Sequence, residues 1–257
     1  MINLPTRRLP ALVRWFPAGP PGSAALTEHV LSTDKGRWWA DRAVRPRAIA
    51  VECGDHVLLR GEPDALVPAD LARFAGCTIE APEPFRPLIA ASFEPVRPWQ
   101  RIVYVKRSAT PPARPPHEVT VRRLTGRDGR ALHRLPPAMH WILRTWGGPH
   151  PFARSGYAWA AFHQGRIVAL ACTYFLGSEY EDIACASVPD PRLRPAVLAC
   201  VHALCFDIAA RRRTPSWTVG AGDRSSRLLA WHAGFRPEHE FTRFAVGDPA
   251  KRAGAAS

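Results

Sequence analysis

Residues 192–197 read RLRPAV and open the stretch that decides the fold of this chain. An apolar helix follows, then a short strand around Trp217, then DRSS at residues 223–226, a second short helix and Gly234-Phe235. A basic turn that opens a helix can hold a phosphate chain, because unpaired backbone N–H groups and arginine side chains converge there. The stretch therefore predicts a site for a phosphorylated ligand beside a helix N-terminus.

The groups expected to contact such a ligand are the charges of Arg192 and Arg194 and the backbone amides near Leu193, Arg194, Ala196 and Val197. Pro195 has no N–H and limits the conformation of the turn. An ordinary helix that begins at a proline, with arginines beside it, explains the same residues. Both interpretations stay open at this stage.

The pattern around this stretch predicts an α+β (mixed α/β) fold, in which helices pack on a twisted sheet. Polar Gln164-Gly165 separates two apolar runs, residues 157–163 and 166–175, and predicts a hairpin. Further strands are expected at residues 48–52, 56–59, 101–105, 119–124, 181–188, 216–219 and 241–246. Helices are expected at residues 24–31, 64–74, 128–135, 138–145, 195–211 and 226–233.

Residues 107–118 contain four prolines and predict an extended linker between two domains. We therefore expect an N-terminal domain over residues 1–106, a linker over 107–118 and a C-terminal domain over 119–246. The small, polar residues 247–257 predict a flexible tail.

Composition limits the classes of function. The net charge is +13, and only three of the 35 basic residues are lysines. The arginines are spread along the chain without a run of five or six like charges, so they permit an anionic ligand but do not predict nucleic-acid binding. None of the six cysteines forms a C-x-x-C pair, so no metal site is expected and a reduced, cytoplasmic protein fits best. Neither a signal peptide nor a membrane span is expected.

The motifs resemble the GNAT superfamily of N-acetyltransferases, and specifically its two-part members with a degenerate N-terminal half. In the C-terminal half the resemblance covers roughly residues 141–244. It rests on the order of Trp141 and Trp146, the hairpin, EDI at 181–183, the turn PDPRLRPAV at 189–197, PSW at 215–217, DRSS at 223–226 and Gly234-Phe235. In the N-terminal half, GRWWAD at 36–41 and Pro46 are also similar to that group.

This resemblance implies a GNAT-like sheet in both halves and acyl transfer, most simply acetyl transfer, from an acyl-CoA such as acetyl-CoA to a primary amine of a small molecule or peptide. The cofactor-binding residues that it implies are Tyr174, Arg192, Leu193, Arg194, Ala196, Val197, Asp223 and Ser226. Glu181 is the first choice for the base by position, with Glu179, Asp182, His140 and His163 as other candidates.

The chain departs from the family pattern at three positions. Pro195 stands where the family has glycine, and Asp223 stands where it has asparagine. Ala230 occupies the position of the tyrosine that serves many of these enzymes as the acid, so solvent or another residue has to protonate the leaving thiolate. A GNAT-like protein that binds CoA without catalysis, or that regulates, is therefore an alternative expectation. The oligomeric state is not predicted.

Overall fold

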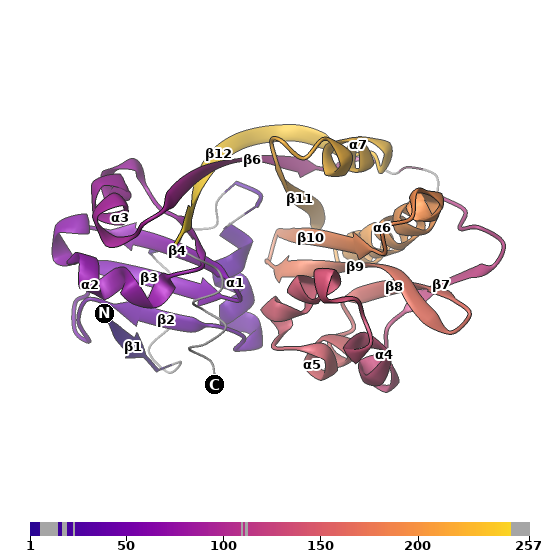
Figure 1. Cartoon of the computed structure of the whole chain (residues 1–257), viewed down its shortest axis with the longest axis horizontal. Helices are drawn as coiled ribbons and strands as arrows, with labels where there is room; N and C mark the ends of the chain where they lie inside the picture. The colour runs from indigo at the N-terminus through magenta and orange to yellow at the C-terminus, as the bar shows by residue number, and fades with distance from the viewer. Residues whose placement is uncertain (6–14, 17–19, 23, 109, 111–112, 248–257) are drawn as a thin grey trace.

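The computed structural model describes residues 1–5, 15–16, 20–22, 24–108, 110 and 113–247. The strands of these residues form one twelve-stranded mixed sheet in the order β1-β2-β3-β4-β5-β12-β6-β11-β10-β9-β8-β7 (Figure 1). Their bounds are β1 Ile2–Leu4, β2 Arg37–Ala40, β3 Ala48–Cys53, β4 His56–Gly61, β5 Thr78–Glu80, β6 Val96–Val105, β7 Val119–Arg123, β8 Ala158–His163, β9 Arg166–Leu176, β10 Tyr180–Ser187, β11 Thr214–Gly220 and β12 Arg236–Val246.

Helices flank the sheet, as expected for the predicted fold class. The α-helices are α1 Ala24–Thr33, α2 Pro68–Leu71, α3 Arg86–Ser92, α4 Gly129–His133, α5 Pro149–Arg154, α6 Arg194–Ala210 and α7 Arg224–His232. The described 3-10 helices are Pro63–Ala65, Ala72–Phe74, Glu83–Phe85, Gly126–Asp128, Pro137–Trp146 and Pro191–Leu193. The mixed α/β fold inferred from the sequence is confirmed.

The last strand of the chain lies among strands of the first half. β12 is antiparallel to β5 and to β6, and β6 is antiparallel to β11 of the second half. Figure 1 shows β12 and β6 running together from one lobe to the other. The sheet is therefore continuous through both halves, and each half contains a strand from the other part of the sequence.

Both halves also share a hydrophobic core. Leu26 and Trp38 from the first half belong to the same buried cluster as Ile142 and Phe175 from the second. A second cluster lies under α6, and a third lies under α2 and α3. The two halves consequently cannot separate without exposing apolar surface.

Local signals predicted several elements well. The hairpin β8–β9 turns at Gln164 and Gly165, whose φ angles of 48° and 75° suit a turn with two left-handed residues. α6 begins one residue before Pro195, which occupies an early helical position where its missing N–H costs little.

Other predicted elements differ from the structure. The expected helix at 64–74 is interrupted by Leu66 and Val67, which have extended conformations, and the part after them changes from α2 to a 3-10 helix at Ala72. The segment expected as a helix at 138–145 is a 3-10 helix that ends at Gly147 with φ 78°. The domain boundaries stay a prediction, and the predicted tail lies outside the described residues beyond Gly247.

α6 is mostly apolar along its length. Together with the preceding turn it forms Pro191–Ala210, the one helix among the described residues that is long and apolar enough to cross a membrane by length and composition, with a mean hydropathy of 1.6. It packs on the sheet, and Cys200, Val201 and Leu204 are buried against it. This core position explains the apolar residues of its buried face.

Candidate active site

A cleft opens where β10 and β11 separate. The two strands pair in parallel at only three positions, from Tyr180↔Thr214 to Asp182↔Ser216. A bulge between Asp182 and Ile183 then shifts the register of β10 against β9. Beyond the bulge, residues 183–187 of β10 pair only with β9 among the described residues. Within the same described part of the chain, residues 217–220 of β11 pair only with β6. Each strand therefore turns one edge, with its backbone donors and acceptors, toward the other.

A cavity of about 510 Å³ lies at this cleft and reaches into the first half of the chain. Its second-half wall includes residues 182–185 and 217–220, together with Asp223 and Ser226 at the start of α7. Its first-half wall includes Asp55, His56, Thr78, Trp99 and Arg101. Tyr174 of β9 and Arg243 of β12 also line it, so both halves build the site.

Asp182 is the buried carboxylate of this cavity, with an exposed fraction of 3%. The hydroxyls of Ser216 and Thr218 donate to its Oδ1, each at 3.1 Å. Burial raises the pKa of the Asp182 carboxyl, although the two hydroxyls and Arg243 oppose that shift. A carboxyl with a raised pKa is better suited to accept a proton near neutral pH than an exposed aspartate.

His56 connects the cavity wall to Tyr174. Nη1 of Arg243 lies 3.3 Å from His56 Nδ1, and the Thr78 hydroxyl lies 3.0 Å from the same nitrogen. A guanidinium can only donate, so Nδ1 is the accepting nitrogen and the ring proton is on Nε2. Nε2 lies 3.2 Å from the Tyr174 hydroxyl and donates to it. The Tyr174 proton is then free to donate elsewhere.

Burial raises the pKa of Tyr174 well above its usual value. The phenol therefore stays protonated throughout the physiological range and can act as a proton donor, but not as a base. Its ring is fixed by edge contacts with His56, Trp141 and Phe175. The resemblance implies Tyr174 as a cofactor-binding residue, and the structure places it on the cavity wall.

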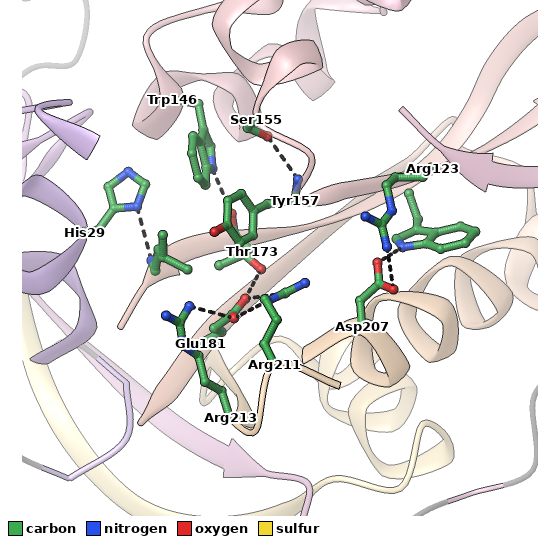
Figure 2. A network of polar contacts seen from close by, with 12 residues as sticks. His29, Arg123, Trp146, Ser155, Tyr157, Thr173, Glu181, Asp207, Arg211 and Arg213 are labelled. Atoms are coloured by element: carbon green, nitrogen blue, oxygen red, sulfur yellow. Dashed lines mark hydrogen bonds and ion pairs between the residues drawn. The ribbon is translucent and has the colours of Figure 1, made fainter. Parts of the chain in front are cut away.

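Glu181, the predicted base, does not line the cavity. Its exposed fraction is 0%, and Arg211 donates to both of its oxygens at 2.8 and 2.7 Å. Arg213 and the Thr173 hydroxyl also donate to it, as Figure 2 shows. With both oxygens held by two guanidinium groups, Glu181 fixes the end of α6 to the sheet. This geometry does not support Glu181 as the base.

The basic turn before α6 binds its own carboxylate. Arg192 N donates to Asp190 Oδ1 at 2.9 Å, and the exposed Arg192 side chain pairs with the same carboxylate. The amides of Leu193 and Arg194 donate to the carbonyls of Asp190 and Pro191. Since Pro195 has no N–H, four successive positions offer no unpaired amide to a ligand.

The remaining predicted site residues divide into two groups. The side chains of Ala196 and Val197 are buried in the core under α6, and neither residue lines the cavity. Asp223 and Ser226 do line it, but Asp223 caps α7 by accepting from the amide and hydroxyl of Ser226. Ala230 is fully buried, so α7 supplies no acid at the expected position.

Sequence reasoning missed the contribution of the first half. Asp55 lies in the turn between β3 and β4, and His56 begins β4. Arg101 lies on β6 and Arg243 on β12. None of these residues belongs to a local motif, because they meet only through pairing between distant strands. The density of arginines along the chain further concealed the two that matter here.

Comparisons with known proteins agree with this geometry. A family model described as GNAT acetyltransferase matches residues 22–244. An uncharacterized N-acetyltransferase in the mutA 5′ region of Streptomyces virginiae is 50% identical over 212 residues, which cover 82% of this chain and 90% of that protein.

Solved structures support the same fold. A GCN5-related N-acetyltransferase-like protein from Streptococcus suis superposes with a TM-score of 0.73 at 16% identity, covering 93% of this chain and 98% of that one. A tandem GNAT protein from the clavulanic acid biosynthesis pathway has a TM-score of 0.57 at 10% identity, with 95% and 96% of the two chains covered. At these identities the structures establish the fold alone.

Proposed function

The chain belongs to the GNAT acetyltransferase family, and from this we propose that it transfers an acyl group, most simply acetyl, from an acyl-CoA thioester to a primary amine. The observation that carries the proposal is the cleft between β10 and β11, with a buried carboxylate and a protonated phenol on its wall. The cofactor would supply the acyl group in activated form. The residues of the chain would position it and move the protons.

The cleft fits an extended arm that carries amide groups. Among the residues that the structure describes, 183–187 of β10 pair only with β9, and 183–185 line the cavity, so a chain of amides can pair with their open edge as an added strand does. The turn before α6 fits a diphosphate less well, because Asp190 neutralises Arg192 and the amides of Arg192, Leu193 and Arg194 already donate within the turn. We therefore assign the grip on the carrier to the strand edge and not to the turn.

Asp182 is our candidate for the base. An ammonium must lose a proton before its nitrogen can attack a carbonyl carbon, and Asp182 is the buried cavity carboxylate whose pKa burial raises. Ser216 and Thr218 hold its Oδ1 and orient the group. It accepts the proton directly or through one water molecule.

Tyr174 is our candidate for the acid. When the amide bond forms, the thioester sulfur leaves and requires a proton. The phenol accepts from His56 Nε2, which leaves its own proton available for the sulfur. Tyr174 on β9 would thus replace the acid that α7 lacks at Ala230.

The test is the release of free CoA thiol from acetyl-CoA in the presence of a panel of amines. We expect Asp182→Asn to lower kcat about 100-fold or more, the range in which a positioned base contributes. Asparagine keeps an oxygen for Ser216 and Thr218, so the variant should fold, which an unchanged Tm would verify. Asp64→Asn, at an exposed carboxylate outside the cavity, is the matched control.

Two results would contradict the proposal. If no amine accelerates thiol release while acetyl-CoA still binds, the chain is a binding protein, the function that the absence of an acid at Ala230 favours. If Asp182→Asn is as active as the Asp64→Asn control, Asp182 is not the base.

A further inference from the structure

Two charged residues of the cavity each keep a buried polar atom without a hydrogen-bond partner. Among the described residues, six buried side-chain nitrogen or oxygen atoms have no partner, and only Asp55 Oδ1 and Arg101 Nε belong to charged groups. Both residues line the cavity at the β10–β11 cleft. A buried polar atom without a hydrogen-bond partner is costly, so a ligand group that hydrogen-bonds to each of these atoms would remove this penalty.

Arg101 is a partly buried cation that has no paired carboxylate among the described residues. Its Nη2 donates to the Thr218 carbonyl at 2.8 Å, and its guanidinium lies 4.1 Å from the centre of the Trp99 ring. No carboxylate of the described chain lies within ion-pair distance of it. Burial lowers the pKa of Arg101 to about 10, so the group remains charged at neutral pH. Arg243, the other arginine of the cavity, already pairs with Glu80.

Asp55 provides the second unpartnered atom, a carboxylate oxygen that can accept a hydrogen bond. Its Oδ2 accepts from Arg144 at 3.1 Å, whereas its Oδ1 lies 3.4 Å from His56 Nε2 without forming a hydrogen bond. Asp55 and Thr78 also line a neighbouring cavity of about 830 Å³, between the 3-10 helix Pro137–Trp146 and β5. A molecule can therefore approach Asp55 from the side away from α7.

We propose that the amine acceptor also carries a carboxylate, in the manner of a free amino acid. Its ammonium group binds Asp55 Oδ1, and its carboxylate binds the guanidinium of Arg101 through Nε. This inference rests on the proposed acyl transfer for the identity of the reaction, but the binding itself does not require it. An amine without a carboxylate leaves Arg101 Nε without a partner, and a carboxylate without an amine leaves Asp55 Oδ1 without one.

The test is calorimetric binding to the full chain, with and without CoA. The probes are the twenty free α-amino acids together with β-alanine and γ-aminobutyrate, which vary the spacing between the two charges. For the tightest of these, the decarboxylated amine and the deaminated acid follow as matched probes. We expect each to bind about tenfold or more weakly than the parent, as the loss of a hydrogen bond to a charged group predicts.

Two variants assign the two ends. Arg101→Gln should weaken binding of the amino acid about tenfold and leave the decarboxylated amine unchanged. Asp55→Asn should weaken the amino acid and the amine, but not the deaminated acid. Arg97→Gln, at an exposed position on the same strand, and Asp64→Asn are the controls, and their binding should equal that of the original chain. Unchanged Tm values would exclude a folding defect.

Three binding results would overturn the inference. They are that no probe binds at millimolar concentration, that Arg101→Gln weakens binding of the amine and the amino acid equally, or that it weakens binding of CoA instead of the amino acid. Failure of acyl transfer is a separate result. If amino acids bind as described but no thiol is released, the acceptor site stands and the proposed reaction does not. If amines without a carboxylate are acylated equally well, the reaction stands and this inference does not.

Discussion

At the scale of the residue, the hydroxyl of Tyr174 is the group whose role depends most on its neighbours. Arg243 and Thr78 surround Nδ1 of His56, and this directs the imidazole proton to Tyr174. We predict that Tyr174→Phe lowers kcat about 100-fold with little change in the KM for acetyl-CoA, because only the protonation of the leaving sulfur is lost. Steady-state kinetics would measure both constants.

Tyr180→Phe provides the control for that experiment, since Tyr180 lies at the start of β10 and does not line the cavity. If the kcat of Tyr174→Phe equalled that of Tyr180→Phe, Tyr174 would not be the acid. A large rise in the KM for acetyl-CoA at constant kcat would instead make Tyr174 a binding residue.

The choice between Glu181 and Asp182 shows what sequence can and cannot predict at this scale. Successive side chains of a strand point to opposite faces, so one of two adjacent carboxylates faces the cleft and the other does not. The sequence EDI predicts a strand with two acidic residues, but it does not predict which of the two side chains lies on the face of the sheet that α6 covers. That is decided by Arg211 and Arg213, which reach Glu181 from the end of α6.

At the scale of the element, α1 is joined to the second half through His29. Its Nε2 donates to the Thr145 carbonyl at 2.9 Å, and its Nδ1 accepts from Leu176 N at 3.1 Å. Burial lowers the pKa of His29 to about 4. Between pH 6.5 and 4 the unfolded chain therefore binds a proton that the folded chain does not, and stability falls as the pH falls.

We predict that this one histidine removes about 3 kcal/mol from the free energy of unfolding between pH 7 and pH 4. Urea unfolding across this range should show a shallower pH dependence for His29→Gln than for the original chain. His117→Gln, at an exposed position, should retain the full dependence. Equal slopes for all three proteins would contradict the assignment.

Elements defined by local signals were predicted well, whereas those defined by distant contacts were not. The hairpin β8–β9 and helix α6 follow from a Gln-Gly turn and an early helical proline. The sequence did not predict that Asp190 occupies the turn before α6. Its carboxylate accepts from the Arg192 amide, which a ligand would otherwise use. Pro195 signalled a departure at this turn, but not the carboxylate that occupies it.

At the scale of the whole molecule, the exchange of β6 and β12 makes the two halves interdependent. β12 lies between β5 and β6, and the shared core contains residues of both halves. The proline-rich linker predicted two domains in series, but strand pairing across the sheet is non-local and leaves no sequence signature. The linker joins the halves along the chain, while the sheet joins them in space.

We predict that the chain unfolds in one cooperative transition. Urea curves followed by tryptophan fluorescence and by far-UV circular dichroism should coincide. If one half unfolded alone, the strands of the other half that pair with it would lose their partners and expose an edge. The separate fragments 1–106 and 119–257 should show no cooperative unfolding. Two resolved transitions in the full chain, or a fragment that folds alone, would contradict this account of the sheet.

The most direct test of the central claim is amide hydrogen exchange on the full chain with and without acetyl-CoA. If the open edges of β10 and β11 hold the carrier, saturating acetyl-CoA slows exchange in peptides that contain residues 183–187, while peptides from the hairpin turn at Gln164 remain unchanged. If residues 183–187 exchange at the same rate with and without the ligand, or if protection is confined to the turn before α6, the cleft is not the carrier site.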